Sequence, residues 1–538
     1  MGSRQAAPAH TAGADKLKQM NETGSLLALQ TRYGPRHRWY LLLAVMVGTM
    51  ASIMSSTIIN VAIPDLSHHF TLGQERAQWV SSGFMVAMTV SMLTTPWLLM
   101  RYGYRTTYLG CMWVLMIGGI AGGLSNQYGL VLAARVVEGL AAGVVQPIPA
   151  IIILRAFAPT EQGRASGFFG RGVVLAPAIG PSIGGVLVDI WGWRSIFFMV
   201  VPFCLTSMWL AYKFVPTTSP GNVPADRNGA PIDWRGLVLA SAGTLCLLNG
   251  LVELHGGTAW GASVLLLAAA AALVAFVAWE RRVARQLTQR IAMGETRVTA
   301  PLMSFDLFRY RQFAMGSVVA FIYGTALFGS TYLLPVFMQR GLGLSASYVG
   351  TILLPAGLVL ALTIAVVGRM ADRQPTYRLV TMGLVLLASS FALMVSVNLG
   401  TGLAWLVTWA IIGRVGLGFI LPSLNLGSMR GVEKALISQG SSVINFVRTL
   451  GGATGVSLCG IMLEWRLTAH GDSLTTAATS AARLDAFDDV FIMLAVVCSL
   501  AIVAAWQLRV PAPGEPSGPS EPSPPSSPSA RSQNGVAR

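Results

Sequence analysis

The chain has 538 residues, of which 53% are hydrophobic and only 11% are charged, and its mean hydropathy is +0.60. Soluble domains carry roughly 25% charged residues, so this composition excludes a soluble globular protein and predicts an all-α polytopic membrane protein. The net charge of +15 does not indicate a nucleic-acid partner, because the arginines lie in short loops between apolar segments. The five cysteines fall within apolar segments at unpaired spacings, so neither a disulfide framework nor a metal site is predicted.

The polar residues 1–35 predict a disordered cytoplasmic arm without a cleavable signal peptide. Fourteen apolar segments follow, each long enough to cross a bilayer as a helix. They are 40–62, 77–99, 105–124, 128–155, 165–190, 195–215, 235–254, 260–280, 312–336, 346–370, 377–398, 402–429, 438–463 and 487–508. The Pro- and Ser-rich segment 511–538 cannot bury a core, so we expect a disordered tail.

Arginine and lysine residues gather in alternate loops between these segments, as the positive-inside rule expects of cytoplasmic loops. The basic stretch 281–311 is therefore expected in the cytoplasm, whereas 65–76 and 464–489 are expected outside. Because the number of crossings is even, both termini are expected in the cytoplasm. The predicted location is the cell (inner) membrane.

An internal repeat divides the chain into two halves. The motif around Arg135 is echoed around Arg414, and the loop 101–105 is echoed by 368–373. With the seventh and eighth segments set aside, two bundles of six helices remain, which resembles the architecture of major facilitator transporters. The predicted domains are an N-terminal bundle, a linker with two extra helices and a C-terminal bundle, at 36–215, 216–311 and 312–510.

The fifth segment presents small residues at multiples of four positions. Gly172, Gly180 and Gly184 form one smooth face that lets a neighbouring helix approach closely, and Pro181 bends the helix. Ordinary membrane packing is one explanation. However, the full string through Gly185 resembles the antiporter motif on helix 5 of major facilitator superfamily exporters. With the two extra central helices, the resemblance points to the fourteen-helix drug:proton antiporter family.

The first segment contains Ser55, Thr57 and Asn60 in a long string that resembles the first-helix signature of that family. In the family an Asp usually stands at the position of Ser55, and this acid is often assigned to proton or cation handling. Its absence leaves two readings. Either Ser55 and Asn60 only hydrogen-bond to a neighbouring helix, or the acidic function has moved elsewhere in the chain.

Arg135 and Glu138 are one turn apart in the fourth segment and share a helix face. At about 1.5 Å per residue from Tyr128, Glu138 lies near the midplane, where an acid is costly unless it is paired or hydrated. The family pattern has Gln at this position. One reading is therefore that Glu138 has taken over the acid of the first helix and carries the proton. In the other, Glu138 neutralises Arg135 permanently and never titrates.

The loop from Gly368 to Arg373 matches the cytoplasmic loop motif Gly-x-x-x-Asp-Arg of the superfamily. The resemblance implies that Asp372 meets a helix N-terminus and an arginine, and so latches one conformation. Pro96 and Met100 occupy the corresponding positions of the first half, so we expect that latch to be weakened or built differently.

The second half offers four candidate cavity residues. Arg414 and Arg448 are further buried cations, Asn445 belongs to a stretch that resembles the family's penultimate inner-face helix, and Tyr323 faces either substrate or lipid. Counting three arginines, Arg135 included, against one glutamate, the interior is net positive. A cavity of that sign favours neutral or weakly acidic amphipathic compounds over divalent cations.

These patterns predict a secondary active transporter that exports lipophilic or amphipathic compounds in exchange for protons by alternating access. The alternative is a proton-coupled transporter dedicated to one metabolite or siderophore, including an uptake system. No lysine follows a glycine, as a phosphate-binding loop requires, which disfavours an ATP-driven pump. No histidine cluster indicates an enzyme, neither tail could fold into the signalling domain of a receptor, and no cofactor is expected. The expected partners are the bilayer, protons and the substrate, with a periplasmic adaptor protein as a further candidate.

Overall fold

The computed structural model describes residues 25–509 except 73, 257, 296, 399 and 473–479. These residues form helices and one isolated β-bridge, so the predicted all-α fold is confirmed. Most of the predicted N-terminal arm and the whole predicted tail lie outside the described residues. The α-helices are α2 (Leu26–Tyr33), α3 (His37–His69), α4 (Gln74–Ser91), α5 (Thr95–Leu124), α6 (Tyr128–Val145), α7 (Ile148–Ala156), α8 (Gln162–Trp191), α9 (Ser195–Phe214), α10 (Trp234–Gly256), α11 (Ala259–Ala292), α12 (Arg311–Val336), α13 (Ala346–Ala371), α14 (Thr376–Met394), α15 (Leu403–Gly427), α16 (Ile437–Ala469) and α17 (Ala481–Trp506).

The described helices accommodate the predicted fourteen crossings. Twelve runs within the described residues are long and apolar enough to cross a membrane. One of them, Trp79–Leu124, has 46 residues. At about 1.5 Å per residue this run is more than twice as long as the ~30 Å hydrocarbon core, so it has the length for two crossings. The 30-residue helix α8 is not among the twelve. The number fourteen itself stays a prediction.

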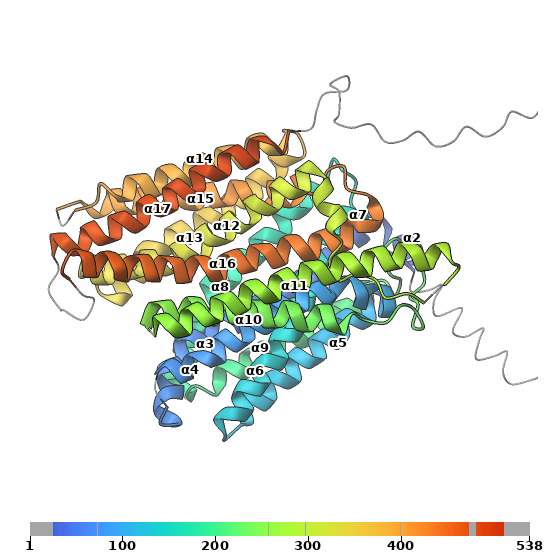
Figure 1. Ribbon diagram of the computed structural model, residues 1–538, viewed down its shortest axis with the longest axis horizontal. Coiled ribbons are helices and arrows are strands. Elements are labelled where there is room, and N and C mark those ends of the chain that lie inside the picture. Colours follow the sequence, from blue (N-terminus) through green and yellow to red (C-terminus); the bar gives the residue numbers. More distant parts are fainter. Residues whose placement is uncertain are drawn as a thin grey trace, which may run out of the picture.

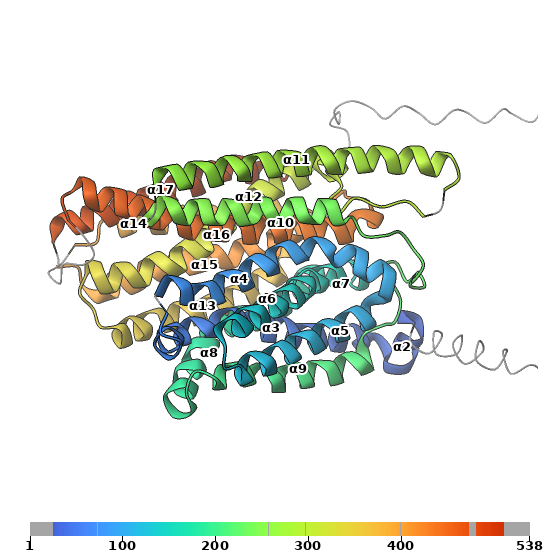
Figure 2. The same cartoon turned by 60° about the horizontal axis from the view of Figure 1, so that its bottom comes forward.

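The helices assemble into two bundles, shown in Figures 1 and 2. Helices α3–α9 surround an apolar core that includes Phe84 and Tyr108, and helices α12–α17 surround one that includes Phe337 and Phe491. Helix α10 contacts α4 of the first bundle and α16 of the second, and α11 packs along α10. The two extra helices therefore lie along the seam between the bundles.

We call the helix ends that carry Arg155, Asp372 and Lys434 the inner ends, and the opposite ends the outer ends. The basic loops lie at the inner ends, which the positive-inside rule predicts to face the cytoplasm.

Three helix boundaries differ from the sequence-based expectation. Helix α2 forms inside the arm expected to be disordered, because the Ser25 hydroxyl caps it by accepting from Ala28 N at 3.2 Å. The fourth segment is interrupted between α6 and α7 at Pro147, whose ring lacks an N–H donor. Helix α11 continues past residue 280 to Ala292, because this stretch contains no Gly or Pro and is rich in arginine, a good helix former.

The loop of the first half is anchored to the linker. Arg105 Nε donates to the carbonyl of Val215 at 2.7 Å. Gly103 turns the chain with φ 75°, and a Cβ at this position would collide with the carbonyl of Thr217, so only glycine fits. The corresponding loop of the first half is therefore attached to the segment that follows α9.

The topology can be tested by thiol labelling in a background without the five native cysteines. We expect cysteines introduced at Ser345 and Gly402 to react with a membrane-impermeant maleimide on intact cells, because both positions lie at outer ends. Cysteines at Gly294 and Gly431 lie at inner ends and should react only after permeabilisation. Labelling of Gly294→Cys on intact cells would contradict the predicted orientation.

Candidate functional site

The middle of the N-terminal bundle contains a buried ion pair. The Arg135 guanidinium and the Glu138 carboxylate are in direct contact on α6, and their side chains are 2% and 1% exposed. Arg135 Nη1 donates to Ser55 Oγ at 2.7 Å, and Nη2 donates to Ser55 O at 3.0 Å. Ser55 Oγ donates to Glu138 Oε2 at 3.2 Å. The guanidinium also lies 4.2 Å from the ring centroid of Phe84 on α4, so the pair connects α3, α4 and α6.

Two glycines of α5 enclose the Glu138 side chain. A Cβ on Gly118 would lie 2.7 Å from Glu138 Cγ, and one on Gly119 would lie 3.2 Å from Oε1 and 3.0 Å from the carbonyl of Phe197 on α9. The carboxylate therefore has almost no exposed surface in this conformation. Sequence reasoning missed Gly118, Gly119 and Phe84, although an adjacent glycine pair inside a predicted membrane helix signals close packing.

The pair has two chemical states. An ionised Glu138 neutralises Arg135 inside a low-dielectric bundle, where an unpaired charge is costly. A protonated Glu138 leaves the guanidinium with Ser55, the Phe84 ring and the carbonyl of Val80, which lies 3.4 Å from Nε. The contacts that hold α6 against α3 and α4 therefore include the ionised carboxylate of Glu138.

The other residues of the first-helix motif make local contacts. Thr57 Oγ1 donates to Ile53 O at 3.1 Å within α3, and Asn60 Oδ1 accepts from Ser81 Oγ of α4 at 3.0 Å. Asn60 thus makes an interhelical hydrogen bond, as its structural reading expects. Ser55, in contrast, contacts both charges of the buried pair.

Small residues of α8 pack closely against α3. A Cβ on Gly172 would lie 2.6 Å from Sδ of Met46, and one on Gly184 would lie 2.5 Å from Cγ1 of Ile58. Real Cβ atoms do not approach other atoms so closely, so a larger residue at either position would have to displace a side chain of α3.

The remaining positions of the antiporter motif differ in their packing. A Cβ on Gly180 would lie 3.1 Å from Oγ1 of Thr57, which is tight but less crowded. Gly185 has nothing within 4 Å of such an atom and faces open space. The side chain of Pro181 lies outside the described residues.

The start of α8 meets Asp372 of the other bundle. Asp372 Oδ1 accepts from Gly163 N at 2.6 Å, and Oδ2 accepts from Arg164 N at 2.9 Å, which is the contact that the resemblance implies for a carboxylate at a helix N-terminus. Partial burial raises the pKa of Asp372, against the opposing effect of these two N–H donors. A Cβ on Gly368 would lie 2.5 Å from Cα of Gly167, so the backbones of α8 and α13 touch.

A second contact joins the inner ends of the bundles. The Arg155 guanidinium on α7 donates to the carbonyl of Lys434 in the loop before α16. Arg373, the last residue of the loop motif, is exposed. The inner ends are thus held together at Asp372 and at Arg155.

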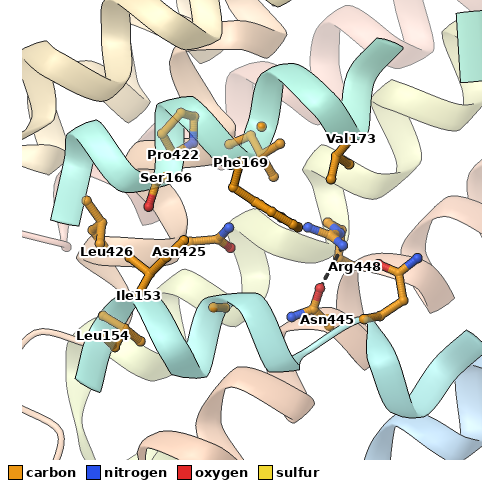
Figure 3. Close-up of a pocket in the computed structure, with 14 residues that line it drawn as sticks. Ile153, Leu154, Ser166, Phe169, Val173, Pro422, Asn425, Leu426, Asn445 and Arg448 are labelled. Atoms are coloured by element: carbon orange, nitrogen blue, oxygen red, sulfur yellow. Dashed lines mark hydrogen bonds between the residues drawn. The ribbon is translucent and has the colours of Figure 1, made fainter. Parts of the chain in front are cut away.

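A narrow pocket extends between the bundles from these contacts (Figure 3). Ile153 and Phe169 contribute to the wall formed by α7 and α8, and Asn425 and Arg448 to the wall formed by α15 and α16. The pocket volume is about 40 Å³, which holds a few water molecules but no drug-sized compound. The inner half of the path between the bundles is therefore constricted in this conformation.

Tyr323, Arg414 and Arg448 come together in the C-terminal bundle. Arg448 lines the pocket, and its Nη2 donates to Asn445 Oδ1 at 2.7 Å, as Figure 3 shows. Gly324, the residue after Tyr323, packs against the backbone carbonyl of Arg448 on α16, and α12 also contacts α15, which carries Arg414. Tyr323 is 2% exposed, so it belongs to the bundle interior and not to the lipid-facing surface. Of the three arginines counted from the sequence, Arg135 is paired with Glu138, whereas Arg414 and Arg448 have no acidic partner among the described residues.

Comparison with known proteins identifies the family. Residues 45–456 match the sequence model of the Major Facilitator Superfamily. The chain belongs to this superfamily. The multidrug export protein EmrB of Haemophilus influenzae is 27% identical over 438 residues, which cover 81% of this chain and 82% of EmrB. The tetracenomycin C resistance and export protein of Streptomyces glaucescens is 27% identical over 429 residues, 80% of this chain and 76% of that protein.

Solved structures of major facilitator proteins share the fold. The human organic anion transporter MFSD10 (TETRAN) superposes with a TM-score of 0.61 at 13% identity, covering 87% of this chain and 99% of MFSD10. The proton:xylose symporter XylE superposes with a TM-score of 0.59 at 12% identity, covering 87% of this chain and 95% of XylE. The chain is therefore a multi-pass membrane transporter of the major facilitator fold.

The packing of α8 against α3 gives a matched pair of variants. We expect Gly184→Leu to lower the melting temperature of the purified transporter and slow transport, because the new side chain must displace Ile58, and overpacking costs about 1–3 kcal/mol. Gly185→Leu, one residue away, should leave both quantities unchanged. Thermal denaturation in detergent and efflux from proteoliposomes measure the two effects. Equal stability of the two variants would contradict the close approach of α8 and α3.

Asp372→Asn tests the contact between α13 and α8. A charge at a helix N-terminus contributes about 0.3–1 kcal/mol and up to ~2 kcal/mol, so its loss should favour open inner ends by roughly 2- to 30-fold. A cysteine at Ser166, which lines the pocket, should then be alkylated faster from the inner side in inside-out vesicles. Asp306→Asn, which changes an exposed acid at the inner ends, is the control. An unchanged alkylation rate in Asp372→Asn would show that this contact does not hold the bundles closed.

Proposed function

We propose that this transporter exports lipophilic or amphipathic compounds in exchange for protons, as a fourteen-helix drug:proton antiporter of the cell (inner) membrane with both termini in the cytoplasm. The observation that supports this most directly is the buried Arg135–Glu138 pair bound to Ser55. Glu138 hydrogen-bonds to the residue that stands where the family usually has an acid. A carboxylate thus occupies nearly the same place, reached from α6 in place of α3.

In the proposed cycle, the described conformation is a state with closed inner ends that awaits a proton. Its inner ends are closed at Asp372 and Arg155, and Glu138 is paired with Arg135. A proton arriving from outside neutralises Glu138 and loosens the attachment of α6 to α3. Helix α3 packs on α8 at Gly184, and the first turn of α8 contacts Asp372. The loosening of α6 from α3 therefore reaches the contact that keeps the inner ends together. Release of the proton to the cytoplasm and binding of the substrate reset the transporter.

The direction of transport is supported by the relatives and not by the fold. EmrB and the tetracenomycin C protein are both named for export, at 27% identity, whereas the same fold serves the symporter XylE. The close packing of α8 on α3 agrees with the resemblance of this helix to the antiporter motif of exporters. The proton gradient can drive such export, since each charge that crosses 100 mV supplies about 2.3 kcal/mol.

The variant Glu138→Gln tests whether Glu138 is needed for proton coupling and not for substrate binding. We expect this variant to lose at least tenfold in pH-driven efflux from proteoliposomes, because an amide cannot release a proton, while the apparent affinity for substrate changes less than about twofold. The panel should include an acidic uncoupler, chloramphenicol and ethidium, so that the test does not depend on substrate charge. Undiminished pH-driven efflux by Glu138→Gln would assign the acid to a structural role.

A second variant tests whether the position of the acid, and not its helix, matters. Ser55→Asp combined with Glu138→Gln moves the carboxylate from α6 to α3, beside the same guanidinium. We expect this double variant to recover part of the pH-driven efflux that Glu138→Gln loses. Ser55→Asn with Glu138→Gln has a similar shape without the charge and should not recover it. Equal efflux by the two double variants would contradict the proposed role of the carboxylate.

A further inference from the structure

The cluster of Tyr323, Arg414 and Arg448 lies well inside its helices. Arg414 is 11 residues from the start of α15 at its outer end, and Arg448 is 11 residues from the start of α16 at its inner end. At about 1.5 Å per residue, each arginine is roughly 16 Å along its helix from the first residue, inside the apolar span of that helix.

Among the described residues, no carboxylate is paired with these two cations. Between residues 311 and 463 the only acids in the sequence are Asp372 and Glu433, and both lie at the inner ends. The remaining acids of α16 and α17 lie near the outer ends of these helices; they are Glu464, Asp485, Asp488 and Asp489. Arg448 donates to the neutral amide of Asn445. Within the described part of the chain, Arg414 makes no hydrogen bond or ion pair with another residue. A guanidinium in this position is costly, and intramembrane arginines are characteristic of functional sites.

A comparison of the two halves of the internal repeat shows which position of the second half lacks an acid. Arg414 occupies the place in the second half that Arg135 occupies in the first, and Leu417 stands where the first half has Glu138. Leu417 is buried. The two halves therefore share an arginine at the same position, but only the first half provides its counter-charge from within the protein.

The cluster is directed toward the space between the bundles. Arg448 lines the pocket together with Leu421 and Asn425 of α15. Arg414 precedes these two residues by seven and eleven positions, so all three share one face of α15. The facing wall from α7 and α8 carries no ionisable side chain, and it presents the aromatic ring of Phe169, which Figure 3 shows reaching toward Arg448.

We propose that Arg414 and Arg448, beside the Tyr323 hydroxyl, bind the acidic group of an amphipathic monoanion such as a carboxylate. This inference rests on the proposed function, in which the space between the bundles carries the substrate. Guanidinium groups match carboxylates in charge and in planar geometry. The apolar body of the ligand packs against the uncharged wall of α7 and α8, at Phe169. The second half thus binds the charge of the substrate, while the first half handles the proton.

An equilibrium binding experiment without any gradient tests this assignment. The probe is 11-(dansylamino)undecanoate, which reports binding to the purified full-length transporter through energy transfer from its tryptophans. The control probe is the primary amide of the same molecule. We expect the acid to bind at least tenfold more tightly than the amide. Arg414→Gln and Arg448→Gln should each remove about tenfold of the acid's affinity, while amide binding stays within twofold and shows that the variants are folded.

Two further substitutions sharpen the result. Arg171→Gln changes an exposed arginine of α8 at membrane depth and should leave both affinities unchanged. Arg414→Lys keeps the charge and should keep part of the preference for the acid. Competition with decanoate and with 2-naphthoate then distinguishes a lipid-derived acid from an aromatic one, according to which displaces the probe at the lower concentration.

Several outcomes would overturn the assignment. Equal affinities of the unmodified transporter for acid and amide would do so, as would an undiminished preference in the double variant Arg414→Gln with Arg448→Gln. If only Arg135→Gln lost the preference for the acid, the binding site for the carboxylate of the probe would lie in the N-terminal bundle. Because the measurement uses no gradient, an intact acid preference with failed pH-driven efflux would refute only the proposed function. Intact efflux without an acid preference would refute only this inference.

Discussion

A guanidinium near the middle of a bilayer needs a counter-charge or water, because the low dielectric makes an isolated charge costly. An arginine stands at the same position of both halves, and its charge is accommodated differently in each half. Arg135 is neutralised by Glu138 and fully enclosed. Arg414 has Leu417 at the matching position and lies on the face of α15 that lines the space between the bundles. The arginine that the two halves share is therefore paired with a carboxylate in the first half and has no acidic partner among the described residues in the second half.

Helix α8 contacts both bundles. It contacts α3 of its own bundle through Gly172 in its inner half and Gly184 in its outer half, and its first turn contacts the other bundle through Gly163 and Asp372. The contact with the other bundle brings the backbones of α8 and α13 together, whereas the contact with α3 brings side chains of α3 against glycines of α8. Both contacts require small residues on α8. Helix α8 thus links the bundle that contains the buried pair to the inner end of α13.

The two extra helices have a different role in the architecture. Helix α10 contacts both bundles, whereas α11 contacts chiefly α10. Large apolar side chains of α11, such as Trp260 and Leu267, are exposed, as is typical of a surface that faces lipid. Because α10 lies along one side of the seam, it restricts lateral access to the space between the bundles from that side. Helices α8 and α13, which contact each other, form the boundary on the opposite side.

The sequence by itself determined the helical fold, the two related halves and most of the residues that the site uses. Each of these follows from local properties: apolar length sets a crossing, basic loops set its orientation, and glycine at intervals of four sets a smooth face. The contact of Asp372 with the start of α8 was also expected, because the loop motif is short and the resemblance specific. The position of Glu138 near the midplane followed from counting along one helix.

Only the tertiary structure decided which of the buried charges are paired. Sequence counts treated Arg135, Arg414 and Arg448 alike, because a one-dimensional pattern cannot show which way a side chain points. Three neighbouring helices enclose Arg135 together with Glu138, and glycines of α5 close around the carboxylate. The net charge of a cavity depends on which cations face it, and that is settled by contacts between helices distant in sequence. For this reason the chain could be assigned to a transporter fold from its sequence, while the distinction between a paired arginine in the first half and arginines without an acidic partner in the second required the packed structure.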